Sequence, residues 1–416
     1  MKLDMQDIGR RAKAAARALA AASATAKRDA LCMMADAVVA SAQEIFAANA
    51  EDLEAARAHG MSEAMLDRLR LNEARLTGMA GGMRKVAAMP DPVGRVLDGD
   101  TLVNGLRLER RTVPFGVIGV IYEARPNVTG DAAALCFKSG NACILRGGSE
   151  AIRSNTAIAH ALWRGLERAG MDPDSVILIE DTSRESAAAL MRMNGYVDLL
   201  IPRGGAGLIR SVVENATVPV IETGVGNCHV YVEKTADIGM AAEIVFNAKT
   251  SRPSVCNAME TLLVDRDIAA QALPAIAARL REKQVEIRGC AETLRILPEA
   301  KPATEEDYAK EFLDYILAVK VVGGIDEAIA HIDRYSTRHS EAIVTRDYAA
   351  AERFTALVDA AAVYVNASTR FTDGGEFGLG AEIGISTQKL HARGPLGLNQ
   401  LVSYKFIVRG DGQVRV

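Results

Sequence analysis

The pattern of apolar and polar positions along this 416-residue chain changes near residue 114. Residues 4 to 89 are rich in Ala, Leu and Met and contain no Pro, which is typical of helices because these side chains lose little freedom there. We expect four or five helices in this stretch, ended by Pro90 and Pro92. From Val117 onward, short apolar runs of strand length alternate with segments of helical length.

These alternating runs predict two series of buried parallel strands, each covered by helices on both faces. The predicted strands of the first series are Val117–Tyr122, Ala142–Arg146, Val176–Ile179, Val197–Ile201 and Val218–Ile221. Those of the second series are His229–Val232, Ala258–Val264, Ile316–Val322, Ala342–Val344 and Val363–Val365. The predicted fold class is therefore α/β, with two parallel-sheet domains.

Two further segments carry turn signals next to short apolar runs. Residues 93 to 113 contain Asp98-Gly99 and Asn104-Gly105, and the C-terminus has Gly410-Asp411-Gly412 after the run at 406–408. Both segments are expected to form hairpins. An exposed strand edge can pair with another chain or only complete its own sheet, and the pattern alone favours neither interpretation.

Composition and cysteine spacing argue against a nucleic-acid-binding, membrane-spanning or zinc-stabilised protein. The net charge of −4, without a basic block, argues against a broad nucleic-acid surface. No stretch approaches the roughly 18 apolar residues of a membrane span. The six cysteines form no CxxC pair, so structural zinc is not expected, and thiols in so long a chain fit a reducing compartment. We therefore expect a cytoplasmic enzyme without a metal, nucleic-acid or membrane partner.

Loops at the carboxyl ends of the predicted strands are the first candidates for a site, because ligands of open parallel sheets bind there. Two glycine pairs in such loops lead into predicted helices, and a glycine loop at a helix N-terminus suits an anion. An arginine precedes each pair, and Arg146 is well placed for an adenosine 2′-phosphate. The chain has no G-x-G-x-x-G after a strand, and for any one loop a tight turn is the better explanation. Several such loops on one edge of a sheet nevertheless favour a bound cofactor. The candidate cofactor-binding residues here are Arg146, Gly147, Gly148, Arg203, Gly204 and Gly205.

Cys256 is the cysteine with the most polar surroundings, in a Pro-containing loop between a predicted helix and a predicted strand. Lys249 and Arg252 are close in sequence and would favour its thiolate. Full ionisation raises the reactive fraction of a thiol about 30-fold at pH 7, or about 2 kcal/mol, so most of the catalysis must come from orienting a carbonyl and stabilising its oxyanion. The Cys256 backbone N–H and the Asn127 amide are candidate oxyanion donors.

Histidine gives a weaker signal. His229 lies at the start of a predicted strand near Glu222 and is the only histidine with a suggestive position. Four others fall on or beside predicted helices, where surface or cap roles are expected: His59, His160, His331 and His339.

Longer motifs resemble the aldehyde dehydrogenase superfamily. The part of that superfamily that binds the cofactor is similar to three segments of this chain, which are Pro114–Gly119, Ser139–Asn141 and the strand to Arg146 with Ser149-Glu150. Glu222 stands 34 residues before Cys256, which is similar in order and spacing to the superfamily's glutamate and nucleophilic cysteine. The resemblance implies a catalytic Cys256 and adds cofactor-binding candidates, which are Ser149, Glu222, Thr223, Gly224 and Glu376.

Four finer motifs resemble the gamma-glutamyl phosphate reductase family, namely Tyr122–Thr129, Ile201–Gly205, Ser251–Asn257 and Gly380–Thr387. That resemblance implies NADPH-dependent reduction of L-glutamyl 5-phosphate to L-glutamate 5-semialdehyde through a Cys256 thioester, the second step of proline biosynthesis from glutamate. Because a base aimed at water would waste the thioester in this direction, we expect Glu222 to orient cofactor or substrate instead. Anion partners for this substrate would come from Arg125, Lys138, Arg252 and Arg370.

Two positions depart from typical aldehyde dehydrogenases. Those enzymes carry an asparagine soon after the first strand, whereas this chain has Arg125 and then Asn127, which leaves the oxyanion donor open. They also carry a lysine after the second strand, where this chain has Arg146. That arginine keeps the positive charge and is compatible with NADPH.

The resemblance also implies a domain plan. Residues 1–93 and 114–226 would form the NADPH-binding domain, and 227–366 the catalytic domain, with 367–398 returning to the cofactor domain. Residues 94–113 and 399–416 would form an oligomerisation element, which implies a homodimer or homotetramer. Glutamate 5-kinase is a plausible partner because an acyl phosphate is labile.

Two other functions stay open. An oxidising, hydrolytic aldehyde dehydrogenase would turn over aldehyde without phosphate and would use a base aimed at water, which in the reductive direction would waste the thioester. A non-catalytic scaffold that keeps the fold would show labelling of Cys256 that neither cofactor nor substrate affects.

Overall fold

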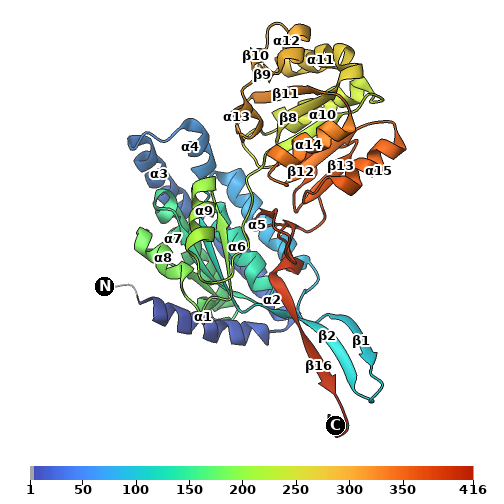
Figure 1. The fold of residues 1–416 in the computed structure, drawn as a ribbon. Coiled ribbons are helices and arrows are strands. Elements are labelled where there is room, and N and C mark those ends of the chain that lie inside the picture. The colour runs from blue at the N-terminus through green and yellow to red at the C-terminus, as the bar shows by residue number, and fades with distance from the viewer. Residues whose placement is uncertain (1–3, 416) are drawn as a thin grey trace. The chain divides into compact units, whose positions relative to one another are not determined.

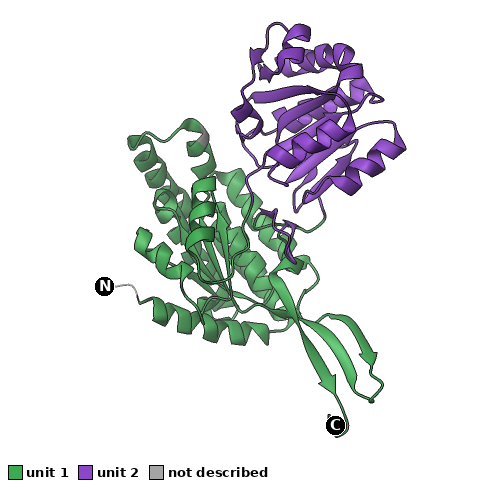
Figure 2. Cartoon of the chain, in the orientation of Figure 1, with its two compact units in different colours: residues 1–223, 378–384, 396–416 green, residues 224–377, 385–395 purple. Residues whose placement is uncertain are grey.

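The computed structural model describes residues 4–415, which form two compact units (Figure 2). Within the described residues, unit 1 comprises 4–223, 378–384 and 396–415, and unit 2 comprises 224–377 and 385–395. Each unit is built around its own parallel sheet. The predicted fold class, with two parallel-sheet α/β units and a small β element, is confirmed.

Unit 1 begins with five helices, as its Pro-free N-terminal stretch predicts (Figure 1). The side chain of Ser23 accepts a hydrogen bond from the Ala26 N–H, and that of Asn72 accepts one from the Arg75 N–H, so both residues cap the helices that follow them. The five helices are α1 (Met5–Ala20), α2 (Ala24–Ala40), α3 (Ala42–Ala58), α4 (Glu63–Leu69) and α5 (Glu73–Ala88).

A four-stranded parallel sheet in the order β5-β4-β3-β6 forms the centre of unit 1. Every residue of β3 is buried, which explains why its sequence is an unbroken apolar run. The strands are β3 (Val117–Tyr122), β4 (Ala142–Gly147), β5 (Val176–Leu178) and β6 (Leu199–Arg203). Between and after them lie α6 (Asn127–Lys138), η1 (Ser149–Ala151), α7 (Ile152–Arg168), η2 (Pro173–Ser175), α8 (Arg184–Met191) and α9 (Ala206–Asn215).

The fifth strand predicted for this series, Val218–Ile221, is wrong. Its only ladder contact is an isolated parallel bridge between Val220 and Leu200. Pro219 lies inside the run and has no N–H to donate, so the backbone cannot continue a regular ladder there.

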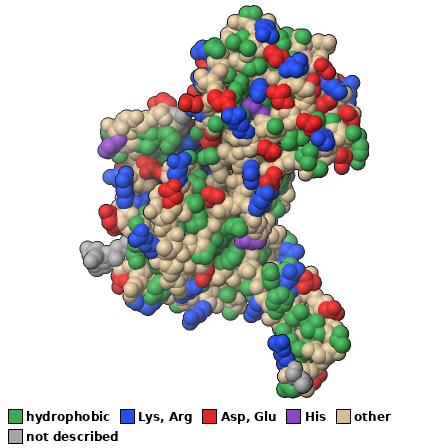
Figure 3. Space-filling view, viewed as in Figure 1, with side chains coloured by type: hydrophobic (Ala, Val, Ile, Leu, Met, Phe, Trp, Pro, Cys, Tyr) green, Lys and Arg blue, Asp and Glu red, His purple; other side chains and the backbone are tan. Residues whose placement is uncertain are grey.

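A three-stranded antiparallel sheet, in the order β1-β2-β16, is the third β element. Its strands are β1 (Val96–Thr101), β2 (Arg107–Pro114) and β16 (Val402–Arg409), the last preceded by η4 (Leu398–Leu401). The hairpin predicted within residues 93 to 113 is confirmed, because β1 pairs antiparallel with β2. The C-terminal hairpin is wrong, because β16 pairs along its whole length with β2 and no return strand follows within residues 410–415. Apolar side chains stay exposed on this β1-β2-β16 sheet (Figure 3), among them Val96, Leu97, Tyr404, Phe406 and Val408.

Unit 2 contains a seven-stranded parallel sheet in the order β10-β9-β11-β8-β7-β12-β13. Val230 and Val232 pack into one apolar cluster and Tyr231 into another, so both faces of β7 are buried. The strands are β7 (Cys228–Val232), β8 (Met259–Asp265), β9 (Glu286–Gly289), β10 (Lys301–Pro302), β11 (Ile316–Val322), β12 (Ser340–Val344) and β13 (Ala362–Val365). The helices are α10 (Ile238–Thr250), α11 (Arg266–Arg281), α12 (Ala291–Ile296), α13 (Glu305–Tyr308), α14 (Ile325–Tyr335), α15 (Tyr348–Leu357) and η3 (Thr369–Phe371), and β14 (Ile385–Ser386) pairs with β15 (Gly394–Pro395).

The sequence did not predict β9 and β10, because neither has an apolar run. Glu286 and Arg288 of β9 form an ion pair, and both residues of β10 are exposed. Short polar strands of this kind are held by pairing with their neighbours rather than by a buried side-chain pattern.

Among residues 4–415, no single helix is long and apolar enough to cross a membrane. Helices α2 and α3 have that length and composition only when taken together, across a bend of 64°. Within unit 1, α2 packs against α5 and α7, and Leu31 and Met34 of α2 are wholly buried.

Candidate active site

Cys256 lies in the turn before β8, at the amino edge of the unit 2 sheet, and its side chain is half-buried. The thiol of Cys228, the first residue of β7, donates to the Cys256 carbonyl oxygen over 3.2 Å. Gly226 packs against the same oxygen, and a Cβ at position 226 would lie 1.4 Å from it, so no other residue fits there. Two neighbours therefore fix the main chain of the predicted nucleophile.

Arg370 of η3 is the cation that the fold brings to Cys256. Its Nε donates to the Ser251 Oγ over 3.0 Å, and its Nη1 donates to the Asn257 Oδ1. Burial lowers the pKa of Arg370, the neighbouring Arg252 lowers it further, and Cys256 opposes both effects. A guanidinium in this position favours a thiolate and can pair with an anionic leaving group.

Asn257 attaches the η3 segment to the nucleophile loop. Its Nδ2 donates to the carbonyl oxygens of Arg370 over 3.2 Å and Thr372 over 3.0 Å. Its own carbonyl oxygen accepts from the Thr369 Oγ1 over 2.7 Å. Sequence reasoning gave Asn257 no role, and its position next to Cys256 was the only signal that could have found it.

Lys249, which was predicted to favour the thiolate, has its charge countered by a carboxylate. Its Nζ lies 2.5 Å from the Glu260 Oε2, and both side chains are wholly buried. Burial raises the pKa of Glu260 to about 7, although Lys249 acts in the opposite direction. Glu260 therefore counters the charge of Lys249, whereas Arg370 interacts electrostatically with Cys256. The help expected from the exposed Arg252 stays a prediction.

The predicted cofactor residues of unit 1 share one edge of its sheet. Tyr122 at the end of β3 pairs with Gly147 on one side and with Arg203 on the other, so the loops after β3, β4 and β6 lie next to one another. The Arg146 Nη2 donates to the carbonyl oxygens of Thr182 and Ser183 over 2.6 and 2.8 Å. Within the described residues, the buried Nε atoms of Arg146 and Arg203 have no hydrogen-bond partner, which fits an edge that receives an anionic cofactor.

Packing inside unit 1 explains several of the predicted glycines without a ligand. The Gly205 N–H donates to the Glu123 Oε2 over 3.0 Å, and a Cβ on Gly204 would lie 2.4 Å from the same oxygen. A Cβ on Gly147 would lie 2.1 Å from the Asn155 Nδ2. Gly148 and the exposed Ser149 complete the loop after β4.

Asn127 begins α6 and is exposed, with its Nδ2 donating to the Asp131 Oδ2 over 2.9 Å. An amide nitrogen carries two protons, so one N–H of Asn127 stays available to a ligand. Arg125 lies half-buried in the same loop. Asn127 and Arg125 belong to unit 1, whereas Cys256 belongs to unit 2.

Lys138 does not fit its predicted role as a substrate ligand. It ends α6, about 16 Å along the helix from Asn127, and so lies away from the sheet edge that carries the other candidates. Its buried Nζ donates to the Ala87 carbonyl oxygen over 2.8 Å. Burial also lowers the pKa of Lys138. These contacts indicate a structural role in joining α6 to α5.

Three of the remaining candidates lie where the chain leaves unit 1 and enters unit 2, after Thr223. The Thr223 Oγ1 donates to the Pro202 carbonyl oxygen over 2.8 Å in unit 1, and the Gly224 N–H donates to the Ile385 carbonyl oxygen over 2.9 Å in unit 2. Glu222 is half-buried in the loop before β7. Glu376 is exposed in a turn of unit 2, with its N–H donating to the Asp373 Oδ1 over 3.4 Å.

Two histidines that were predicted at surface or cap positions are buried. His331 of α14 lies among the rings of Tyr308, Tyr335 and His229, and His339 precedes β12 with no exposed surface. Burial lowers the pKa of His331 to about 3. The helical spacing of the sequence did not reveal that this face of α14 packs against the sheet.

Comparisons with known proteins agree with the sequence motifs. The model of the aldehyde dehydrogenase family matches residues 2–306. The gamma-glutamyl phosphate reductase of Moorella thermoacetica is 60% identical over 413 residues, which cover 99% of both chains, and that of Heliobacterium modesticaldum is 60% identical over 98% of both. The crystal structure of the Thermotoga maritima gamma-glutamyl phosphate reductase superposes with a TM-score of 0.96 at 49% identity over 99% of both chains. An acetylating aldehyde dehydrogenase from Geobacillus thermoglucosidasius shares the fold, with a TM-score of 0.72 at 19% identity over 99% of this chain and 97% of that one.

Proposed function

The chain belongs to the aldehyde dehydrogenase family and, within it, to the gamma-glutamyl phosphate reductases, and from this membership we propose that it reduces L-glutamyl 5-phosphate to L-glutamate 5-semialdehyde and phosphate. The family resemblance predicted from the motifs at Tyr122–Thr129 and Ser251–Asn257 is confirmed. The reaction is the reductive second step of proline biosynthesis from glutamate.

The structural observation that carries this proposal is the placement of Arg370 beside Cys256. A thiol nucleophile needs a polarised carbonyl, and an acyl phosphate supplies one with a good leaving group. The Arg370 guanidinium, held by Ser251 and Asn257, can accompany the phosphate as it leaves without any proton transfer. We assign the exposed Arg252 and the half-buried Arg125 as further partners for the anionic groups of the substrate.

We propose that the reaction proceeds through a thioester at Cys256. The thiolate attacks the acyl carbon, the carbon–oxygen bond to phosphate breaks, and a glutamyl thioester and free phosphate result. Hydride adds to the thioester carbon, and the hemithioacetal oxyanion then expels the Cys256 thiolate and releases the aldehyde. The Cys256 N–H and the remaining Asn127 amide proton are the proposed donors to that oxyanion.

A nicotinamide cofactor belongs to this family, and we propose that it is NADPH. When bound, NADPH supplies the hydride. Arg146, whose buried Nε has no hydrogen-bond partner among the described residues, would hold the adenosine 2′-phosphate, with the cofactor-binding candidate Ser149 in the same loop. Arg203 would add positive charge at the same edge. The glycines and the Glu222–Gly224 loop would let the main chain approach the rest of the cofactor, and Glu376 is proposed as a further cofactor-binding residue.

Glu222 is proposed to orient cofactor or substrate rather than to activate water. Water is the hazard of this reaction, because hydrolysis of the thioester would discard the substrate. Glu222→Gln keeps the shape of the side chain and removes its basicity. We expect this variant to keep most of its reductase activity, and a complete loss would contradict the assignment.

We also propose that the protein works as a homodimer or homotetramer assembled through the β1-β2-β16 sheet, whose exposed apolar side chains support such pairing. A nucleophilic thiol needs a reducing compartment, which supports the cytoplasm. Glutamate 5-kinase is a proposed functional partner, since direct transfer would protect the labile acyl phosphate. Failure of the two proteins to co-purify or to channel the intermediate would remove that last proposal.

The test follows nucleotide reduction in the reverse direction, with glutamate 5-semialdehyde and NADP⁺ and with or without phosphate. NADPH formation that depends on phosphate and disappears in Cys256→Ser supports the proposal. Turnover without phosphate would identify an oxidising, hydrolytic aldehyde dehydrogenase instead. A matched Cys290→Ser variant, in a cysteine outside the site, is expected to behave like the unaltered protein.

A further inference from the structure

Residues 310–313 form the middle of the connection from α13 to β11 and have no regular secondary structure, and we call this segment the 310–313 connector. Leu313 within it has φ +57°, a left-handed conformation that a branched residue rarely adopts. Such a conformation persists only where the surroundings fix it, and it occurs most often near functional sites.

Three consecutive residues of the connector make separate contacts. The Glu311 Oε1 accepts a hydrogen bond from the Gly226 N–H over 2.8 Å. The ring of Phe312 lies under the Nζ atoms of Lys249 and Lys310, at 5.9 and 5.7 Å from the ring centre, and under Arg288 at 5.3 Å. These cation–π contacts attach the connector to the buried Lys249.

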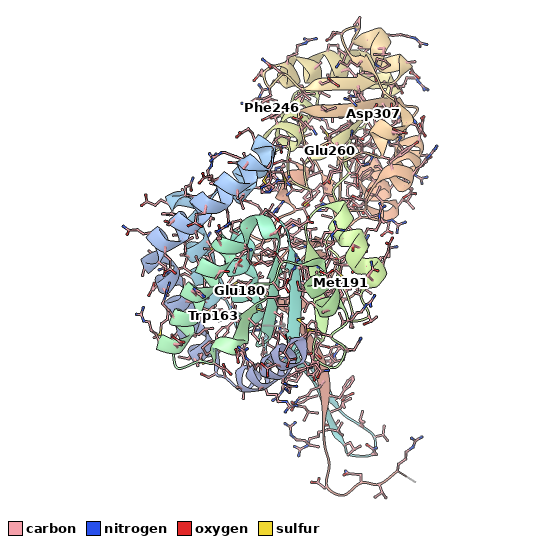
Figure 4. The ribbon with its side chains drawn as sticks, turned by 90° about the vertical axis from the view of Figure 1, so that its left-hand side faces the viewer. Trp163, Glu180, Met191, Phe246, Glu260 and Asp307 are labelled. Atoms are coloured by element: carbon pink, nitrogen blue, oxygen red, sulfur yellow. The ribbon has the colours of Figure 1, made fainter. Side chains whose placement is uncertain are left out.

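The next residue reaches the partner of that lysine. The Leu313 N–H donates to the Glu260 Oε1 over 3.2 Å, and Glu260 lies on β8 inside unit 2 (Figure 4). Lys249 precedes Cys256 by seven residues and Glu260 follows it by four. The connector thus contacts the chain on both sides of Cys256.

Gly226 is the contact that reaches Cys256 itself. Its N–H is held by Glu311, and its α-carbon packs against the Cys256 carbonyl oxygen so closely that no Cβ fits. A shift of Gly226 would therefore move the Cys256 peptide group or open a gap beside it. Because productive attack requires reacting atoms placed within a fraction of an ångström, such a shift would slow acylation.

We propose that Glu311 is a positioning residue for Cys256, which acts by holding Gly226 against the main chain of the nucleophile. The inference rests on the proposed function of Cys256. Glu311 raises the pKa of Cys228 and of Glu260 as a like charge, so it does not favour further negative charge on these neighbours. Its contribution beside Cys256 is therefore the hydrogen bond that fixes Gly226.

The test compares Glu311→Ala and Glu311→Gln, with Glu306→Ala on α13 as the matched control, since Glu306 is an exposed carboxylate five residues away. Glu311→Ala removes the acceptor of the Gly226 N–H, whereas Glu311→Gln keeps an acceptor oxygen and removes the charge. We expect Glu311→Ala to lower kcat about 10- to 100-fold with little change in KM, and Glu311→Gln to restore most of it. Glu306→Ala is expected to match the unaltered protein.

A second measurement does not depend on turnover. The rate at which iodoacetamide alkylates Cys256, assigned by peptide mass spectrometry, is followed against pH. In Glu311→Gln, removal of the negative charge is expected to move the midpoint of this curve to lower pH, which separates the effect of the charge from the loss of the Gly226 hydrogen bond in Glu311→Ala. Circular dichroism verifies that each variant is folded, and Glu311→Gln keeps the proposal testable if Glu311→Ala does not fold.

Equal kcat in Glu311→Ala and Glu306→Ala would overturn the proposal. So would a Glu311→Gln variant that is as slow as Glu311→Ala and has an unmoved alkylation midpoint. If the unaltered protein shows no phosphate-dependent reduction, the proposed function fails, and the alkylation of Cys256 in the three variants still decides the role of Glu311.

Discussion

The Lys249 Nζ and the Glu260 Oε2 lie 2.5 Å apart, and neither side chain has exposed surface. The pair joins α10 to β8, the two elements that flank the Cys256 loop. Desolvation raises the pKa of Glu260 and lowers that of Lys249, so burial opposes both charges, and their mutual contact is the largest effect that favours them. Each charge therefore depends on the other.

Glu260→Ala is expected to lower the free energy of unfolding by about 3–5 kcal/mol, because it leaves the Lys249 ammonium buried without its partner. Chemical denaturation at neutral pH measures this change. The double variant Lys249→Met/Glu260→Leu removes both charges and is expected to be more stable than Glu260→Ala. A double variant no more stable than the single one would show that the apolar shape of the site, rather than the uncompensated charge, sets the loss.

We expect His331 to make the free energy of unfolding depend on pH. Burial lowers the pKa of His331 to about 3, whereas an unfolded histidine titrates near 6.5. Between these values the unfolded chain binds more protons than the folded one, so stability falls as the pH falls through this window. One proton gives a slope of at most about 1.4 kcal/mol per pH unit.

The measurement compares denaturation midpoints of the unaltered protein and His331→Phe from pH 7 to pH 4.5. The variant keeps an aromatic ring among Tyr308 and Tyr335 and is expected to lose less stability on acidification. His59→Phe, at an exposed helix end, serves as the control and is expected to follow the unaltered protein. Parallel curves for all three proteins would exclude His331 as the source of the acid sensitivity.

The strands could be predicted from the sequence because burial on both faces leaves a local signal. Val117–Tyr122 and Ile316–Val322 are recovered with their full bounds, since nearly every residue in them is apolar. Pro219 shows the limit of that signal, because the apolar run around it was assigned without regard to its missing N–H. Polar strands such as β10 carry no such pattern at all.

The site could be predicted only where a motif is contiguous. Cys256 and its neighbours lie in one seven-residue motif, which the sequence shows directly. Glu311 contacts Gly226 across 85 residues of sequence, and no local pattern indicates that contact. The substrate role predicted for Lys138 does not fit for the same reason. The charge of Lys138 suggested an anion partner, but its position at the far end of α6, where it bonds to Ala87, follows from the tertiary fold. Charge is visible in a sequence, but the partner that neutralises it is not.

Arg370 tests the electrostatic part of the proposed mechanism. Arg370→Lys keeps a positive charge but cannot hold both Ser251 and Asn257, so we expect kcat to fall about 10-fold. Arg370→Met removes the charge as well, and we expect a larger loss together with slower alkylation of Cys256 by iodoacetamide. Steady-state kinetics and alkylation rates check both. Unchanged alkylation in Arg370→Met would separate this arginine from the thiolate.

Arg146 tests the assignment of NADPH. Arg146→Met removes the charge proposed to meet the 2′-phosphate, so KM for NADPH is expected to rise about 10-fold or more while KM for NADH changes little. The ratio of kcat/KM for the two nucleotides is the quantity to compare. Arg168→Met at the exposed end of α7 is the control. An equal rise in both KM values would indicate that Arg146 only supports the carbonyl groups of Thr182 and Ser183.

We expect subunits to pair through the β1-β2-β16 sheet. Tyr404 and Phe406 lie on one face of β16 with their ring centres 5.8 Å apart, and Phe406 is 58% exposed. A neighbouring subunit would cover such rings, so Phe406→Asp is expected to shift the sedimentation profile toward smaller species by placing a charge in the contact. Lys405→Ser changes a residue on the opposite face of the same strand and is expected to leave the profile unchanged. If Phe406→Asp sediments like the unaltered protein while its circular dichroism is also unchanged, then the subunits do not meet through this face, and the sheet only completes the fold of its own chain.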